Sequence, residues 1–203
     1  ATLKAGDTTS LMASMQQLGQ GLHELIVEMD RMSAAHDKGD IDVQIAADRF
    51  QGSYRSMAQG INDMVNGHIA VKKKAMACIR SFGEGDLSAP LESFPGKKAF
   101  INENIELLRT NVLALINDMK HMSSEHEKGD IDVMIDVDRF RGSYRDIGQG
   151  INEMVSGHIN VKKKAMACIR AFGEGDLAAS LEQFPGKKAF INENIEQLRA
   201  NIL

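Results

Sequence analysis

The sequence is short of several residue types, and each shortage narrows the classes of protein that it can encode. Its 203 residues include 2 cysteines, 3 prolines, 2 tyrosines and no tryptophan. Two cysteines do not make the disulfide framework of a small secreted domain, so we expect a reducing, cytoplasmic location. No apolar run reaches the roughly 18 residues of a membrane-spanning helix, which predicts no membrane contact within this segment. The 12 methionines supply apolar volume in a form that suits helices.

An excess of positive charge is also missing. The chain has 24 basic and 28 acidic residues, for a net charge of −4. Its longest basic runs are Lys72-Lys73-Lys74 and Lys162-Lys163-Lys164. Because a nucleic-acid partner requires a broader basic face, we predict no nucleic-acid binding. Both lysine runs are interpreted as solvated side chains.

What the sequence has instead is repetition. Residues 60–109 and 150–199 are identical at 42 of 50 positions, without a gap and at an offset of 90. A Gly-Asp-apolar signature recurs at intervals of 46, 44 and 46 residues, starting at Gly39, Gly85, Gly129 and Gly175. Each glycine is predicted to end a helix with a positive φ. Such periods indicate repeated supersecondary units, so we predict four units in which alternate units are more alike than neighbours.

Apolar residues recur between these glycines with alternating gaps of three and four. This heptad spacing predicts five long helices, of which the last is incomplete, and a left-handed supercoil. Apolar residues beside the main line widen the stripe to three positions in seven, which favours a bundle of four helices. The predicted bundle seam comprises Met57, Ile61, Met64, His68, Val71, Cys78, Phe82, Ile101, Ile105, Leu108, Val112, Leu115, Met119, Ile151, Met154, His158, Val161, Cys168 and Phe172.

Connectors separate the helices at residues 39–53, 84–97, 129–143 and 174–187. An extended segment of 14 residues spans up to about 45 Å, whereas a helix of that length covers about 21 Å. A connector can therefore return along a helix, so that the helices before and after it run parallel. The residues predicted to pack the connectors into a helix groove are Ile41, Val43, Ile45, Phe50, Leu87, Leu91, Phe94, Ile131, Val133, Ile135, Phe140, Leu177, Leu181 and Phe184.

The polar residues that could carry chemistry also have structural explanations. No nucleophile, base and orienting group occur at a spacing that suggests an active site, so we predict no enzymatic activity, no catalytic residue and no cofactor or metal. His68 and His158 lie on the seam, where a polar residue that fixes register is favoured over a metal, haem or protonation site. Cys78 and Cys168 are interpreted as buried apolar thiols, and the alternative is an intermolecular disulfide.

The repeated order of helix, Gly-Asp-apolar turn, extended connector and second helix resembles a string of HAMP domains. The segments 60–65 and 150–155, Gly-Ile-Asn-Asp-Met-Val and Gly-Ile-Asn-Glu-Met-Val, are similar to the family's Phe-Asn-x-Met pattern. At the start of the second helix, Gln51-Gly52-Ser53-Tyr54, Arg141-Gly142-Ser143-Tyr144 or Phe-Pro-Gly-Lys-Lys replaces the family's Asp-Glu-apolar-Gly element. The resemblance is therefore to divergent units of the kind strung together in poly-HAMP chemoreceptors.

The resemblance implies an all-α fold of parallel four-helix coiled-coil bundles, formed by a homodimer, stacked end to end and joined by continuous helices. We expect the second helix of a truncated upstream unit at residues 1–29, then units at 30–68, 69–116, 117–158 and 159–203. The segment is expected to belong to a longer inner-membrane chemoreceptor and to relay signals in the cytoplasm toward kinase and coupling proteins. The alternatives are a passive coiled-coil spacer and a cofactor-binding bundle that uses His68, His158, Met64 and Met154.

Overall fold

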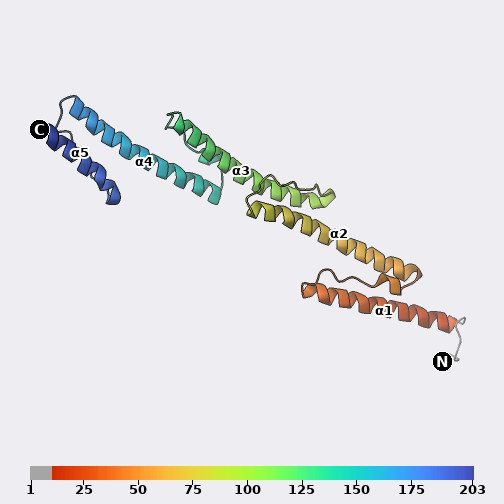
Figure 1. Ribbon diagram of the computed structural model, residues 1–203. Helices are drawn as coiled ribbons and strands as arrows, with labels where there is room; N and C mark the ends of the chain where they lie inside the picture. Colours follow the sequence, from red (N-terminus) through yellow and green to blue (C-terminus); the bar gives the residue numbers. More distant parts are fainter. Residues whose placement is uncertain (1–10) are drawn as a thin grey trace. The chain divides into compact units, whose positions relative to one another are not determined.

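A computed structural model describes residues 11–203 of the chain, and within this range the protein is helical and has no strands. The long helices are α1 (Leu11–Asp37), α2 (Gly52–Gly83), α3 (Ala99–Glu127), α4 (Ser143–Gly173) and α5 (Ala189–Ile202) (Figure 1). The all-α prediction is confirmed. Residues 1–10 of the predicted upstream unit lie outside the described residues.

Two kinds of connector join the helices. Residues 38–51 and 128–142 follow a histidine that lies three residues before the connector glycine, and we call them the histidine connectors. Residues 84–98 and 174–188 have phenylalanine at that place, and we call them the phenylalanine connectors. Each connector is extended and ends in one short 3-10 turn before the next helix: η1 (Ala47–Arg49), η2 (Gly96–Lys98), η3 (Val137–Arg139) or η4 (Gly186–Lys188).

The chain divides into an N-terminal part, Ala1–Ile105, and a C-terminal part, Glu106–Leu203. In the N-terminal part, α1 and the first half of α2 lie side by side and run in the same direction (Figure 1). In the C-terminal part, α4 and α5 have the same parallel arrangement. The extended connectors make this possible because they return along the helices. Among residues 11–203, no helix is both long and apolar enough to cross a membrane.

Helix ends and connector starts are set by one backbone motif. The N–H of Asp40 donates to the carbonyl of Ala35 (3.0 Å), and the N–H of Gly39 donates to that of His36 (2.9 Å). This pair of hydrogen bonds is a Schellman motif, which requires a left-handed residue at the glycine. Gly39, Gly85, Gly129 and Gly175 have φ angles of 92°, 93°, 100° and 94°. The motif stops each helix and directs the chain back along it.

Four small apolar clusters form the core, one for each connector. Together with the partly buried residues packed against it, each cluster joins side chains of the helix before the connector, the connector itself and the helix after it. The first contains Leu25, Met32, Ile45, Phe50 and Ala58; the second Ala75, Cys78, Phe94 and Ile105; the third Leu115, Met122, Ile135 and Phe140; the fourth Ala165, Cys168, Phe172 and Ile195. Helix α2 thus serves the first cluster near its start and the second cluster near its end.

Candidate functional site

Each connector is fixed to the helix that follows it by an asparagine. The N–H of Ile45 donates to Oδ1 of Asn62 (3.0 Å), and Nδ2 of Asn62 donates to the carbonyl of Ile45 (2.8 Å). Asn152 makes the same pair of hydrogen bonds to Ile135, at 3.0 and 2.8 Å. The side-chain amide therefore takes the place of a neighbouring β-strand, because it satisfies a donor and an acceptor of the connector backbone.

The phenylalanine connectors are held in a related way. Asn102 accepts from the N–H of Phe94 (2.9 Å) and donates to the carbonyl of Glu92 (2.8 Å). Asn192 binds Phe184 and Glu182 at the same two distances. Asn102 and Asn192 each form hydrogen bonds to two connector residues, whereas Asn62 and Asn152 each form both of their hydrogen bonds to one residue.

Sequence reasoning assigned no role to these asparagines. The dipeptide Ile-Asn stands at residues 61–62, 101–102, 151–152 and 191–192, but it also stands at 116–117 and 159–160, so it does not by itself identify them. The distance of each asparagine along the chain from its connector contact, between 8 and 17 residues, gives no local signal for the pairing.

Ion pairs add a second attachment, and their polarity differs between the two kinds of connector. In the first histidine connector, Arg49 Nη1 lies 2.9 Å from Oε1 of the buried Glu28 on α1. In the second, Arg139 Nη1 lies 3.0 Å from Oδ1 of Asp118 on α3. The helix supplies the acid and the connector supplies the base.

The phenylalanine connectors reverse this arrangement. The helix supplies Lys74 or Lys164, at the same distance of eleven residues before the connector glycine as Glu28 and Asp118. The connector supplies the acid: Lys74 pairs with Glu92 at 2.5 Å, and Lys164 pairs with Glu182. These pairs are about half exposed, so each contributes roughly 0 to 1 kcal/mol.

Glu28 is the most enclosed of the four helix residues in these ion pairs. Arg31 Nη2 donates to Glu28 Oε2 (2.8 Å) and to the carbonyl of Gln44 (2.6 Å), so that it links α1 to the connector. The hydrogen bond from Arg31 lowers the pKa of Glu28 below its ordinary value of 4.5; burial opposes the shift, whereas the backbone N–H of Ala46 and the charge of Arg49 support it.

One connector carbonyl, four residues after the glycine, is bound differently in the two kinds of unit. In the histidine connectors, His36 Nε2 donates to Val43 and His126 Nε2 donates to Val133, both at 2.8 Å. In the last phenylalanine connector, Arg199 Nη2 donates to Ala179 (2.6 Å). The two histidines, which lie in the last turns of α1 and α3, therefore also hold their connectors.

The residues predicted to pack the connectors fall into three groups by exposure. Ile45, Phe50, Phe94, Ile135, Phe140 and Phe184 are buried. Val43, Leu87, Leu91, Val133, Leu177 and Leu181 are partly buried. Ile41 and Ile131 are 39% and 37% exposed, because they stand in the turn directly after the connector glycine.

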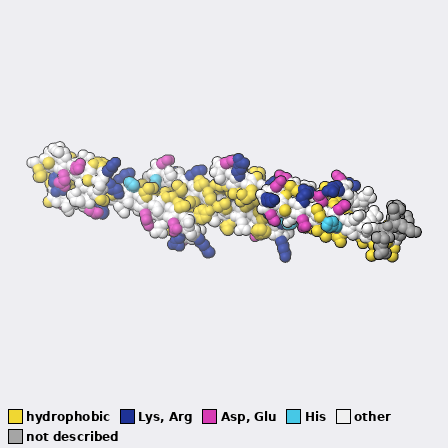
Figure 2. All heavy atoms as spheres, turned by 90° about the horizontal axis from the view of Figure 1, so that it is seen from below, with side chains coloured by type: hydrophobic (Ala, Val, Ile, Leu, Met, Phe, Trp, Pro, Cys, Tyr) yellow, Lys and Arg dark blue, Asp and Glu magenta, His cyan; other side chains and the backbone are white. Residues whose placement is uncertain are grey.

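The predicted seam residues also divide by exposure within the single chain. Cys78, Ile105, Leu115, Cys168 and Phe172 are buried. Ile61, Val71, Phe82, Ile101, Val112, Ile151 and Val161 are partly buried. Met57, Met64, His68, Leu108, Met119, Met154 and His158 are exposed, and Met64 and Met154 are both 58% exposed. Apolar side chains are accordingly visible on the surface of both parts (Figure 2).

The polar residues of the seam do not form a cluster suited to a metal. Within residues 11–203, no three His, Cys, Asp or Glu side chains come together as such a group. His158 Nδ1 lies 2.8 Å from the carbonyl of Met154, one turn earlier on α4. The thiols of Cys78 and Cys168 are buried beneath the phenylalanine connectors, where Sγ lies 3.8 Å from the carbonyl of Ala89 and 3.7 Å from that of Ala179, respectively.

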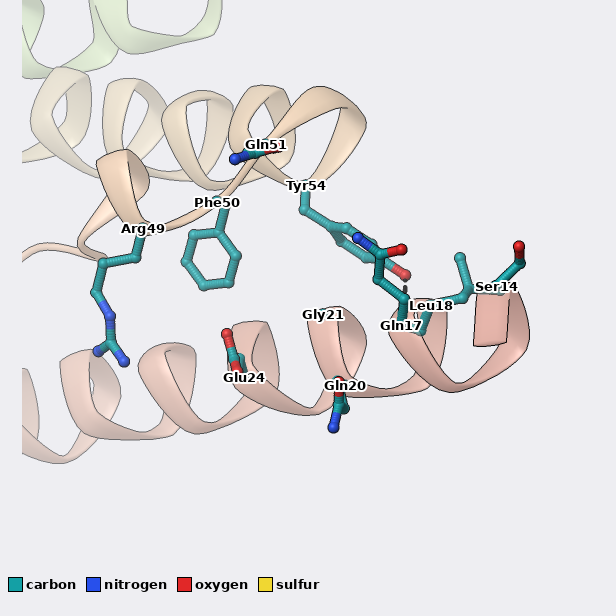
Figure 3. A pocket seen from close by; sticks show the side chains of 10 residues that line it. All are labelled: Ser14, Gln17, Leu18, Gln20, Gly21, Glu24, Arg49, Phe50, Gln51 and Tyr54. Carbon is teal, nitrogen blue, oxygen red and sulfur yellow. Dashed lines mark hydrogen bonds between the residues drawn. The ribbon is translucent and has the colours of Figure 1, made fainter. Parts of the chain in front are cut away.

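An open groove of about 470 Å³ lies between α1 and the start of α2 (Figure 3). Tyr54 crosses it, and its hydroxyl donates to the carbonyl of Leu18 (2.9 Å). A Cβ at Gly21 would lie 2.9 Å from the Tyr54 ring, so glycine permits this close approach. Tyr54 therefore fixes the start of α2 against α1.

Two family models match the chain in alternation. The model described as "Methyl-accepting chemotaxis protein McpB, second HAMP domain" matches residues 13–67 and 110–157, and "HAMP N-terminal domain 3" matches residues 71–112 and 161–203. The chain is also similar to the methyl-accepting chemotaxis protein McpB of Pseudomonas aeruginosa, with 28% identity over 155 residues. That alignment covers 68% of this chain and 22% of the relative, so the chain spans about a fifth of the relative's length.

The asparagine attachment predicts a specific loss of stability. Changing Asn62 to Ala removes both hydrogen bonds to Ile45 and leaves buried backbone groups without partners, so we expect the free energy of unfolding to fall by about 1–3 kcal/mol in chemical denaturation. Asn66 is the matched control, because its amide is exposed and accepts only from Gln44. Equal effects of Asn62→Ala and Asn66→Ala would contradict the assignment.

The enclosed carboxylate predicts a pH-dependent loss. Because the folded pKa of Glu28 is lowered, its contribution is complete above the unfolded value near 4.5 and disappears as the pH falls through the folded value. We expect Glu28→Gln to cost about 1 kcal/mol at pH 7, and progressively less as the pH falls below 4.5 toward the folded pKa, measured by urea denaturation over a series of pH values. Glu24→Gln, on the same helix, should have no comparable effect; a pH-independent cost at Glu28 would refute the role of its charge.

Proposed function

Because the chain belongs to the HAMP family, as tandem HAMP domains of a methyl-accepting chemotaxis protein, we propose that it relays conformational signals within a chemoreceptor. HAMP domains of chemoreceptors are signalling modules, and we propose no catalytic activity for this chain. Its position is the cytoplasmic side of an inner-membrane receptor, between a sensor and an output that controls a kinase through coupling proteins.

The proposal rests on the continuous helices, each of which belongs to two units. Helix α2 contributes Ala58 to the first core cluster and Ala75 and Cys78 to the second. A rotation, tilt or loosening of such a helix in one unit is a displacement in the next. The mechanism is a shift of population between two packings of each unit, and successive units take opposite bias. A passive spacer has no need of two unlike units in regular alternation.

The exposed seam supports a parallel homodimer. Met57 and Met64 on α2, like Ile147 and Met154 on α4, stand seven residues apart and are between 49% and 58% exposed in the single chain. An apolar stripe at heptad spacing is stable only when a second stripe covers it. Two helices from each of two chains complete a four-helix bundle, so the proposed partner is a second copy of this chain.

Dimerisation is tested with charges placed in the exposed seam. We expect the chain to sediment as a dimer at micromolar concentration, and we expect Met64→Glu combined with Met154→Glu to raise the dissociation constant at least tenfold, because it buries charge in an apolar seam. The control pair Met64→Leu and Met154→Leu keeps the apolar volume and should leave the dimer intact. A monomeric parent chain would refute the proposal.

Relay is distinguished from spacing by two deletions in the full-length receptor. Removal of residues 73–116, from within α2 to within α3, takes out one unit, and removal of residues 73–162 takes out a pair. We expect inverted or locked kinase output after the first deletion and near-normal output after the second, measured by the receptor's kinase response. Indifference to both deletions would establish the spacer instead.

A further inference from the structure

The two lysine runs are not merely solvated, because neighbouring lysines of one helix bind the connectors of two successive units. On α2, Lys73 Nζ lies 3.1 Å from Oδ1 of Asp42 in the histidine connector. The next residue, Lys74, pairs with Glu92 of the phenylalanine connector at 2.5 Å. One turn of α2 is thus attached to a connector that precedes the helix and to one that follows it.

The same arrangement occurs in the C-terminal part. Lys163 Nζ lies 3.1 Å from Oδ1 of Asp132, and Lys164 pairs with Glu182. Consecutive residues of an α-helix point about 100° apart, so the two ammonium groups leave the helix on adjacent flanks. Each flank receives one connector. We call Lys73-Lys74 and Lys163-Lys164 the lysine junctions.

Other contacts position the junctions. Asp42 lies three positions before Ile45, which Asn62 binds. The carbonyl of Glu92 itself accepts a hydrogen bond from Nδ2 of Asn102. Each lysine therefore binds a connector close to the point where an asparagine fixes its backbone. A change in the path of the connector at that point moves the carboxylate relative to the helix.

We propose that each lysine junction couples the conformations of two successive units, by tying both of their connectors to one turn of the helix they share. This coupling rests on the proposed relay function and specifies where the relay passes between units. Release of one connector lets the shared turn move and weakens the ion pair on its other flank. All four pairs are between 51% and 80% exposed, so each has a small effect.

Hydrogen exchange of the intact 203-residue chain measures this coupling. The reporters are the amides bound by the asparagines, Ile45 and Ile135 in the histidine connectors and Phe94 and Phe184 in the phenylalanine connectors. With Lys73→Gln and Lys163→Gln, we expect two- to fivefold faster exchange at Ile45 and Ile135 in low salt, the range given by exposed pairs. Coupling predicts faster exchange at Phe94 and Phe184 as well, although their own ion pairs are retained.

Three further variants complete the experiment. Lys74→Gln with Lys164→Gln should accelerate exchange in the same two sets of amides. Lys72→Gln with Lys162→Gln makes the same change in charge at lysines that form no ion pair within residues 11–203, and it should leave all four amides unchanged. Exchanging the charges, with Asp42→Lys and Lys73→Asp together, should restore the parent rate at Ile45 and Phe94.

The outcomes separate this proposal from the relay itself. If each lysine change affects only the connector it touches, or affects neither, the junctions do not couple the units. Unchanged or slower exchange in the remote connector also overturns the proposal. Coupled exchange in the chain together with indifference of the full-length receptor to unit deletions would leave the junctions standing and refute the relay.

Discussion

The structure depends on how an irregular connector satisfies its backbone beside two helices. A segment of 14 or 15 residues without a strand partner would leave N–H and carbonyl groups unpaired against the apolar core. One asparagine of the following helix supplies a donor and an acceptor to each connector, and Asn62 and Asn192 are themselves 4% and 5% exposed. Once this point is fixed, the neighbouring apolar residues of the connector enter the core. The parallel arrangement of the helices follows from the return path that the connector then takes.

Sequence patterns predicted the elements of this fold better than the contacts between them. The heptad spacing gave the helices, and the glycine signature gave their ends, because both are local consequences of helix geometry. The side chains of Asn62 and Asn102 meet the chain 17 and 8 residues away, and periodicity carries no information about such pairing. The lysine runs are a similar case: exposed lysines are usually solvated, and only the position of both connectors shows what Lys73 and Lys74 bind. His36 lies in the last turn of α1, and only the path of the connector shows that it binds the carbonyl of Val43.

The two kinds of unit share an apolar design and differ in their polar attachments. Both place a phenylalanine of the connector in the core, at Phe50 and Phe94 and in their repeats. The histidine connectors bind a helix carboxylate through arginine, whereas the phenylalanine connectors bind a helix lysine through glutamate. Apolar packing is non-directional and accepts either kind of connector. The opposite polarity distinguishes them, because an arginine of one kind would face a lysine of the other.

The contrast between strong and weak contacts fits the proposed relay, in which each unit adopts one of two packings. A two-packing switch requires states that differ by only a few kcal/mol, since a larger gap leaves the minor state unpopulated. The buried apolar residues of the connector and the hydrogen bonds of the asparagine hold each connector near its helices in a defined register. The half-exposed ion pairs contribute roughly 0 to 1 kcal/mol each, so in the proposed relay they would bias the balance between two packings without fixing it. A contact of that size becomes effective when two units share one continuous helix, because a shift in one unit then changes the balance in its neighbour. In the proposed relay, the weak surface attachments at the lysine junctions are therefore the contacts through which the balance between two packings is best adjusted.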